Sequence, residues 1–492
     1  MESPASFAQS LLSQQVRWQH PTIVNSGIDQ TRLAIADAPI EVSDGEGSSF
    51  SFLVIGDTDA GNSAGNEDVF SQAFAEQVVA HSGDCRFLLH TGDVAYPTGS
   101  YKNYFNRFLV PYQALLKQLP SSPFYNSREI IFDKALLSVP GNHDYSDCPT
   151  TLRYWKRLLR MVCDRLRSTT GVDLGCYGGE GGEAYSQTFL DDLKCLAPEQ
   201  LKTHLSQHYA AKVDDIKVDD IKVDDANDSS NYCLSYQPGR FTRLPNRYYT
   251  FRYGDVDFFA LDSNTWNTSP DKKGFDQAQL DWLEASLIHS WQTPSIIGRI
   301  VYLHHSPYTT EALHWQQPET MWVRKHLRKV FDSVAQSVKA AKGNSPVVDL
   351  VLSGHAHCLE HLKTSPSLLG DSEIDWVVCG GSGASVRGQR GGNAEILEKV
   401  SIKGRHQTKI VARSQQFIGR QKHRRKEQAL HSFVRIDINP QQTQKIVVSP
   451  LVVTQINGEW RTKALAPLAT GTPGSAYQPE AASDRASEMA KV

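Results

Sequence analysis

The sequence contains few cysteines, and they are scattered. There are 8 cysteines in 492 residues, and no two of them form a CxxC pair. Small secreted domains that are held together by disulfides have a much higher cysteine density, so we expect reduced thiols. The N-terminus also lacks a basic segment followed by a long apolar one, so it does not have the pattern of a secretory signal.

Long apolar runs and a strong net charge are missing as well. No stretch approaches about 18 uninterrupted apolar residues, the length that a transmembrane helix needs. The net charge of −3 argues against a chain that binds nucleic acid through its overall charge. The C-terminal sequence MAKV is not a prenylation signal. We therefore expect a soluble cytoplasmic protein without a membrane partner.

Strand-like apolar runs alternate with stretches of helical periodicity from Ser49 onward, which predicts layered α/β packing around central sheets. A hairpin is expected over 248–263, turning at Gly254. The other expected strands cover 50–56, 85–92, 134–141, 299–305 and 347–354. The expected helices cover 69–83, 106–119, 276–291 and 320–343.

The composition divides the chain into a main domain, two inserts and two ends. We predict an N-terminal extension over 1–45, a main domain over 46–460 and a disordered tail over 465–492. An insert at about 146–245 carries the pentad KVDDI twice, followed by the near copy KVDDA. These pentads lack the turn glycine and closing glutamate of a calcium loop, so a solvated surface segment is expected. An insert at about 387–426 is basic, and it is either a solvated loop or a patch that attracts an anionic substrate or partner.

Polar residues that can bind metals follow five of the predicted strands directly. In open α/β sheets, the loops beyond the carboxyl ends of the strands form the ligand crevice, so these residues are expected to meet in one pocket. They are Asp57, Asp93, the run Asn142, His143 and Asp144, the pair His304 and His305, and the pair His355 and His357.

The types of these residues narrow the chemistry. Carboxylate, amide and imidazole groups without a thiolate suit iron, manganese or zinc in five- or six-coordinate sites better than tetrahedral structural zinc. His355 and His357 are two residues apart, so in extended chain both point the same way and can serve two adjacent metals. Each pattern alone is weak, because a Gly-Asp pair after a strand is usually a turn. Their occurrence together, each after a strand, indicates a metal centre.

At this point the chain resembles the calcineurin-like metallophosphoesterase superfamily. The motifs GD, GDxxY, GNHD, HHSP and GHAH occur in the order that this family uses, over about residues 50–385. The resemblance implies a four-layer αββα sandwich of two mixed β-sheets flanked by helices. It also implies a centre of two metal ions that hydrolyses a phosphate monoester or diester with activated water, so the main domain would be the catalytic one.

One departure from the family pattern favours its purple acid phosphatase-like branch. Asp59 stands where most of the superfamily has histidine, and that branch instead uses the tyrosine of GDxxY, here Tyr96. A tyrosinate ligand favours trivalent iron. Asp59 is a possible alternative ligand.

The resemblance implies a set of ligands for each metal. The first metal would be held by Asp57, Asp93, Tyr96 and His357, and the second by Asp93, Asn142, His355 and a strand histidine. His305 is preferred for that position because Pro307 follows it by two residues, and His304 is the alternative. His143 would protonate the leaving oxygen, and Asp144 would orient His143 or a neighbouring imidazole, with a helix N-cap as the alternative for Asp144.

Two other functions are compatible with the same sequence. One is a degenerate family member that binds a protein and does not catalyse. The other is a nuclease guided by the basic insert, which is disfavoured because the insert has few aromatic residues for stacking on bases. The expected partner is therefore a phosphate-ester substrate, with no nucleic acid, and the expected cofactors are two ions of iron, manganese or zinc.

Overall fold

The computed structural model describes the greater part of the predicted main domain. The described residues are 28–36, 49–58, 67–96, 99, 101–122, 129–145, 197, 200, 203–204, 207–211, 232–242, 247–272, 275–367, 369–391, 394–402, 405–423 and 426–471. Asp59, the KVDDI repeat and residues 472–492 of the predicted tail lie outside them, so the predictions for these segments stay predictions.

Six strands form the smaller of two large sheets. Their order across the sheet is β21-β20-β19-β2-β3-β6, and β2, β3 and β6 run parallel. The strands are β2 (Phe50–Ile55), β3 (Phe87–His90), β6 (Ala135–Ser138), β19 (His431–Ile438), β20 (Ile446–Ile456) and β21 (Glu459–Ala464).

Eleven strands form the larger sheet. Their order is β15-β16-β13-β14-β12-β11-β10-β9-β1-β8-β7, with β10, β11, β12 and β14 parallel to one another. The strands are β1 (Ile28–Ile35), β7 (Tyr209–Ala211), β8 (Tyr232–Tyr236), β9 (Tyr249–Tyr253), β10 (Val256–Ala260), β11 (Gly298–Leu303), β12 (Leu350–Ser353), β13 (Leu359–Thr364), β14 (Asp375–Cys379), β15 (Glu395–Ile402) and β16 (Arg405–Ile418).

Aromatic side chains pack the two sheets face to face. Phe52 of β2 meets Phe258 of β10 edge to face, with ring centroids 5.5 Å apart, and Phe87 of β3 meets Phe251 of β9 at 5.8 Å. All four rings are buried, and they belong to one core cluster that includes residues of both sheets. Burial of apolar surface at this interface stabilises the pairing of the sheets.

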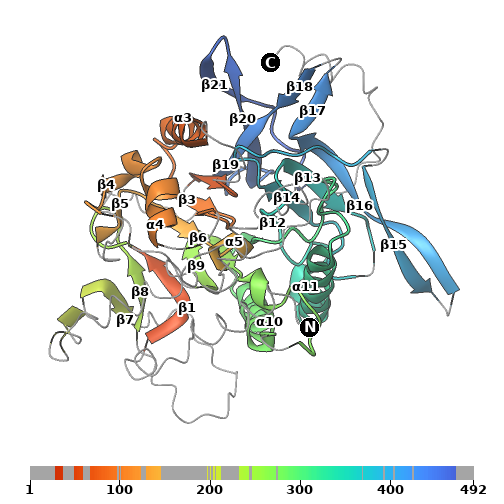
Figure 1. The fold of residues 1–492 in the computed structure, drawn as a ribbon. Coiled ribbons are helices and arrows are strands. Elements are labelled where there is room, and N and C mark those ends of the chain that lie inside the picture. Colours follow the sequence, from red (N-terminus) through yellow and green to blue (C-terminus); the bar gives the residue numbers. More distant parts are fainter. Residues whose placement is uncertain are drawn as a thin grey trace.

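Helices cover the outer faces of both sheets (Figure 1). On the six-stranded sheet lies α3 (Glu67–Ala80), whose Phe74 packs against Phe433 of β19 at 5.9 Å. On the eleven-stranded sheet, α10 (Gln277–Gln292) and α11 (Pro318–Ser337) share a core cluster with residues of β11 and β12. The predicted four-layer αββα sandwich is therefore confirmed.

One predicted helix, 106–119, is wrong. Helix α4 (Tyr101–Tyr104) ends before this segment and is followed by a π-helical turn at Phe105–Leu109. A 3₁₀ turn at Gln113–Leu115 and strand β4 (Leu116–Gln118), which pairs with β5 (Ile131–Phe132), make up the rest. Pro111 explains the break, because proline lacks the N–H that an α-helix needs and clashes with the preceding turn.

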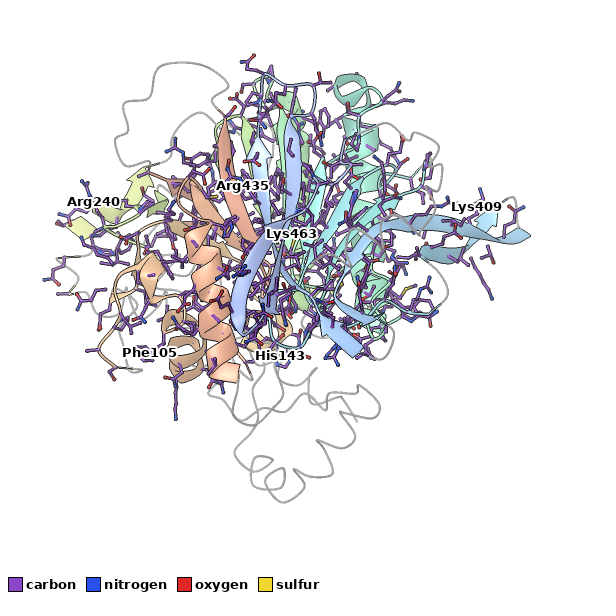
Figure 2. All side chains as sticks on the ribbon, turned by 90° about the horizontal axis from the view of Figure 1, so that it is seen from above. Phe105, His143, Arg240, Lys409, Arg435 and Lys463 are labelled. Carbon is purple, nitrogen blue, oxygen red and sulfur yellow. The ribbon has the colours of Figure 1, made fainter. Side chains whose placement is uncertain are left out.

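The basic insert contains strands, so its interpretation as a solvated loop is wrong. β15 and β16 form an antiparallel hairpin, and β16 also pairs with β13, which joins the hairpin to the larger sheet. Figure 2 shows Lys409 on the part of this hairpin that projects from the body. A second hairpin follows, made of β17 (Arg420–His423) and β18 (Lys426–Ala429).

The sheets extend beyond the segment where the sequence signals are strong. β1 comes from the predicted N-terminal extension and pairs with β8 and β9. At the other end, Leu465 and Leu468 donate backbone hydrogen bonds to Pro450 and Val448, so the first residues of the predicted tail pack along β20. No helix among the described residues is both long and apolar enough to span a membrane.

Candidate metal centre

The carboxyl ends of parallel strands from both sheets meet at one place. Asp57, Asp93 and Asn142 follow β2, β3 and β6 of the smaller sheet, and His304 and His355 follow β11 and β12 of the larger one. Helix α5 (Asn142–Tyr145) begins directly at this point. The predicted convergence of the strand ends is therefore present.

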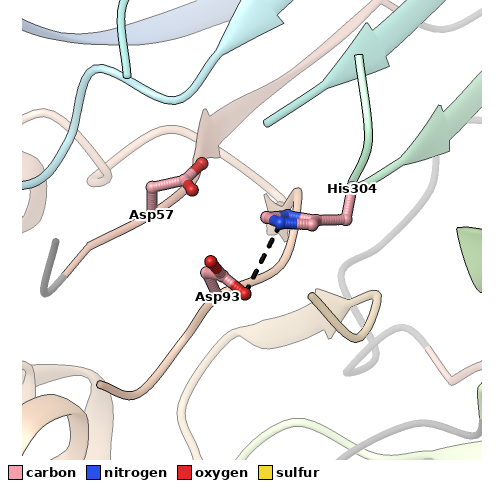
Figure 3. A group of neighbouring side chains, drawn as sticks. All are labelled: Asp57, Asp93 and His304. Carbon is pink, nitrogen blue, oxygen red and sulfur yellow. Dashed lines mark ion pairs between the residues drawn. The ribbon is translucent and has the colours of Figure 1, made fainter. Parts of the chain in front are cut away.

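Two carboxylates and one imidazole form the centre of this group (Figure 3). Ligand-type atoms of Asp57, Asp93 and His304 all lie within 4.8 Å of one another, and the three residues are buried. His304 Nε2 lies 3.5 Å from Asp93 Oδ1. Burial and the neighbouring Asp93 charge raise the pKa of Asp57 well above its usual value. A cation between the two carboxylates would remove this repulsion.

The hydrogen bond of His304 Nδ1 leaves Nε2 of the same ring unprotonated, with its lone pair directed toward neighbouring polar atoms. Its Nδ1 lies 3.0 Å from the carbonyl oxygen of Thr91, which can only accept, so Nδ1 carries the proton. Burial lowers the pKa of His304, so the ring is neutral and Nε2 is unprotonated. That nitrogen lies 2.9 Å from Asn142 Oδ1, which is also an acceptor, and 3.2 Å from His355 Nδ1. These nitrogen and oxygen atoms are of the types that bind metal ions in proteins.

His357 and His355 have the same kind of environment. His357 Nδ1 lies 2.8 Å from the carbonyl oxygen of Ser385, and its Nε2 lies 3.7 Å from Asp57 Oδ1. His355 Nδ1 lies 3.0 Å from Asn142 Oδ1, whereas its Nε2 is buried without a hydrogen-bond partner among the described residues. Burial lowers the pKa of both rings well below the usual value. Neutral imidazoles with unsatisfied nitrogens are suitable metal ligands.

Tyr96 lies between the two carboxylates. Its hydroxyl donates to Asp93 Oδ2 at 2.6 Å and lies 3.3 Å from Asp57 Oδ1. Burial, followed by the charges of both aspartates, raises the pKa of Tyr96, so the phenol keeps its proton without a metal. A bound cation would reverse this preference and favour the phenolate.

The positions of the two adjacent histidines favour His304 over the predicted His305 as the histidine ligand that follows β11. His304 belongs to the carboxylate group, whereas both ring nitrogens of His305 are used elsewhere: Nδ1 lies 2.8 Å from Ser263 Oγ and Nε2 lies 3.2 Å from Asn267 Nδ2. Successive side chains at the end of a strand point to different sides, so the two rings separate. The His305 ring still packs against His355, with centroids 4.6 Å apart.

Asp144 accepts hydrogen bonds from backbone amides of two loops. Its carboxylate accepts from Gly141 N at 2.8 Å, Val94 N at 3.1 Å and Ala95 N at 3.3 Å. It therefore joins the loops after β3 and β6, which differs from both the predicted orienting role and the N-cap alternative. His143 donates its backbone N–H to Asp93 Oδ1 at 2.8 Å, and its ring packs on Tyr96 at 4.2 Å.

Three residues near the centre were missed by the sequence interpretation. The ring of His314 packs on His355 at 4.3 Å, and it is hydrogen-bonded to the buried carboxylate of Glu311 at 2.5 Å. Arg387 Nη1 lies 3.4 Å from the His314 ring nitrogens. A single histidine after the HHSP motif and an arginine in a basic stretch carry no spacing pattern, so only the folded chain identifies them.

The sequence profile of the calcineurin-like phosphoesterases matches residues 50–359, which is well over half of the chain. The chain belongs to the calcineurin-like phosphoesterase family. Membership implies metal-dependent hydrolysis of phosphate esters, and the group of Asp57, Asp93 and His304 is available to hold a metal.

Several solved structures are similar to the chain over most of its length. The GAP50 anchor of the inner membrane complex of Plasmodium has 14% identity, covers 86% of this chain and 90% of its own, and gives a TM-score of 0.37. PhoD has 10% identity, 86% and 72% coverage and a TM-score of 0.37. A single mutant of Vps29 from Entamoeba histolytica has 9% identity, 85% and 99% coverage and a TM-score of 0.24. No curated protein matches the chain significantly.

Proposed function

We propose that this phosphoesterase family member hydrolyses phosphate esters at a centre of two metal ions. The observation that carries the proposal is the convergence of imidazole nitrogens on amide and carboxylate oxygens in one buried place. His304 Nε2 faces Asn142 Oδ1 at 2.9 Å, His357 Nε2 faces Asp57 Oδ1 at 3.7 Å, and His355 Nε2 has no partner among the described residues. Cations satisfy all three nitrogens and the buried carboxylates at once.

The proposed ligands fall into two sets that share Asp93. Asp57, Asp93, Tyr96 and His357 would hold the first ion, and Asp93, Asn142, His304 and His355 would hold the second. Two bound cations would lower the pKa of a water molecule and neutralise charge that develops on the phosphoryl group. Their identity is proposed to be iron, manganese or zinc.

The protein's own contribution is to hold these groups in place before substrate arrives. Backbone carbonyls of Thr91 and Ser385 fix the ring orientations of His304 and His357. Asp93 fixes the start of α5 by accepting the N–H of His143, whose ring is thereby held beside the carboxylates. His143 is the proposed donor of a proton to the leaving oxygen. Asp144 supports it indirectly, by holding together the loops on either side.

Tyr96 supports the purple acid phosphatase-like branch. Its hydroxyl is already hydrogen-bonded to one carboxylate of the first set and 3.3 Å from the other, so it would reach a cation bound there. A ferric ion bound to tyrosinate produces a visible absorption band. We expect this band in the iron-loaded wild-type protein and its loss in Tyr96→Phe. An iron-loaded protein without a Tyr96-dependent band would contradict the branch assignment.

The activity itself is tested by metal analysis together with hydrolysis of aryl phosphate esters. Purified wild-type protein is expected to hold about two ions per chain and to release aryl alcohol from a phosphate monoester or diester. Asp93→Asn should lower the metal content at both positions, because Asp93 is the shared ligand. Wild-type protein that binds metal yet releases no alcohol from either ester would favour the non-catalytic alternative. Full metal content in Asp93→Asn would contradict the bridging role.

A further inference from the structure

Two loops from distant parts of the chain are joined at the side of the candidate metal centre. Glu311 and Gln389 form an isolated antiparallel bridge. Ala312 N donates to Gly388 O at 3.1 Å, and Arg390 N donates to Thr310 O at 2.8 Å. The first loop follows β11 and carries His314, and the second follows β14 and carries Arg387. Their pairing fixes both side chains relative to the centre.

The backbone of Arg387 is tied directly to a proposed metal ligand. Its N–H donates to the carbonyl oxygen of His357 at 2.8 Å, and its own carbonyl accepts from Arg420 N at 2.9 Å. Its side chain reaches back to the centre, because Nη1 lies 3.4 Å from the ring nitrogens of His314. The His314 ring in turn packs on His355 at 4.3 Å. The guanidinium is therefore held beside the imidazoles.

The guanidinium of Arg387 is in ion-pair contact with no carboxylate among the described residues, although its charge, after that of His314, helps to lower the pKa of the nearby Glu311. Several other arginines of this fold are paired, such as Arg328 with Asp371 at 2.8 Å and Arg247 with Asp262 at 2.7 Å. Arg387 forms no such ion pair among the described residues, and it is half-buried. The nearby Glu311 carboxylate already accepts from the His314 ring and from two backbone N–H groups. A fixed guanidinium in this position is suited to bind an anion.

We propose that Arg387 binds a terminal oxygen of the substrate's phosphoryl group and makes this site prefer dianionic phosphomonoesters over monoanionic phosphodiesters. The inference rests on the proposed phosphoesterase function. A monoester has one more terminal oxygen and, above its second pKa of about 6, one more negative charge than a diester. The guanidinium fork matches phosphate oxygens and keeps its charge at all physiological pH values. Arg387 therefore contributes more binding free energy to a monoester than to a diester.

The test compares Arg387→Met with Arg390→Met. Arg390 is a matched control: it lies three residues away in the same loop, but its guanidinium packs over Trp315 at 4.0 Å and contacts the backbone of Glu395. For each metal-loaded protein, kcat/KM is measured for 4-nitrophenyl phosphate and bis(4-nitrophenyl) phosphate. Binding of inorganic phosphate is measured by calorimetry, after metal content and the thermal unfolding midpoint have been determined.

Loss of one charged hydrogen bond corresponds to a change of about 10- to 100-fold in a binding constant. Arg387→Met is expected to weaken phosphate binding and monoester kcat/KM by that factor, with much less effect on the diester and none on metal content. Arg390→Met should keep the wild-type ratio of the two esters. If Arg387→Met folds poorly, Arg387→Lys serves instead, because it keeps the charge and loses the fork; an intermediate loss of phosphate affinity is then expected.

Unchanged phosphate affinity and an unchanged ester ratio in a folded, metal-loaded Arg387 variant would overturn the inference. An equal loss with Arg390→Met would also overturn it, because the effect would then come from general surface charge. These outcomes differ from failure of the proposed function, in which wild-type protein itself hydrolyses neither ester. Phosphate binding needs no turnover, so it tests Arg387 in that case as well.

Discussion

Asp57, Asp93 and His355 share a backbone conformation that residues with side chains rarely adopt. Their φ angles are +56°, +55° and +67°, and each directly follows a glycine. Such residues cost of order 1 kcal/mol or more each and persist where the surrounding fold holds them. Here the left-handed turn aims each side chain at the same point immediately after its strand. The strain thus lies at the three positions from which both proposed ions would be held.

The choice between His304 and His305 can be tested residue by residue. His304→Ala is expected to reduce the metal content from about two ions per chain to about one, because a ligand of the second ion is lost. His305→Ala should keep both ions, since its nitrogens contact Ser263 and Asn267 instead. Elemental analysis of the two purified variants, each normalised to protein, measures the difference. The reverse pattern would restore the sequence-based preference for His305.

Motif order identified most of the residues that the fold brings together, but not all. Asp57, Asp93, Tyr96, Asn142, His355 and His357 were expected at one site, and the structure brings them there. The spacing of Pro307 from His305 could not decide between adjacent histidines, because that decision depends on which side of β11 faces the smaller sheet. Arg387 is brought to the site by the backbone pairing of two loops and by its own N–H bond to His357, which no local pattern encodes.

The loops that follow β3 and β6 approach each other more closely than ordinary side chains allow. A Cβ added to Gly141 would lie 2.0 Å from Asp93 Oδ1 and 2.3 Å from Asp93 N. The amide of Gly141 also donates to Asp144, so the two loops are joined through the same position. Two neighbouring parallel strands can place Asp93 and Asn142 side by side only because a glycine stands between them.

Gly141→Ala is therefore expected to damage both stability and metal binding. The added methyl group must displace the backbone at Asp93, which typically costs about 1–3 kcal/mol of unfolding free energy and shifts a bridging carboxylate. Gly391→Ala is the matched control, because nothing lies within 4 Å of its added Cβ. Thermal unfolding and metal content are measured for both variants. Equal behaviour of the two would mean that the close approach at Gly141 is unimportant.

Elements with a continuous apolar run were predictable, and those that depend on distant pairing were not. β2, β3, β6, β11 and β12 are fully apolar or nearly so and occur where the sequence predicted strands. Half of β15 and most of β16 are charged or polar residues, and β16 joins the sheet by pairing with β13 on one side and with the edge strand β15 on the other. A polar sequence of this kind also fits a loop, so its strands become visible only with the partner present.

The candidate centre lies where the two sheets meet, so acidic and basic side chains are brought together there away from water. Their pKa values shift in opposite directions, because the histidines and two of the aspartates favour the neutral form. The histidines His304, His355 and His357 at the centre have lowered pKa values, chiefly through loss of hydration. Burial and the Asp93 charge raise the pKa of Asp144 to about 8. Charging either kind of group destabilises the folded protein. The histidines become charged at acidic pH, and the carboxyl group of Asp144 becomes charged at alkaline pH.

The direction of each effect follows from proton binding. Below about pH 6.5 the unfolded chain binds more protons at the histidines than the folded chain does, so stability rises as the pH is raised. Between about pH 7.5 and pH 8.5 the histidines are almost entirely neutral in both states, whereas folded Asp144 still holds part of a proton that the unfolded chain has lost, and the raised pKa of Asp57 acts in the same direction. Stability of the metal-free protein therefore falls with rising pH in that window, by roughly 1 kcal/mol per pH unit for one proton.

The loss of stability at alkaline pH should be measurable in the metal-free protein and absent from the metal-bound protein. In the presence of a chelator, the unfolding midpoint of the wild-type protein is expected to decline from about pH 7.5 to pH 8.5, as measured by thermal or urea unfolding. Asp144→Asn should reduce the decline, because one of the two carboxyl groups with a raised pKa is gone. With metal bound, the charge of Asp93 is offset, so Asp144 can ionise and the slope should disappear. A metal-free protein that becomes more stable between about pH 7.5 and pH 8.5 would contradict the proposed protonation of the buried carboxyl groups.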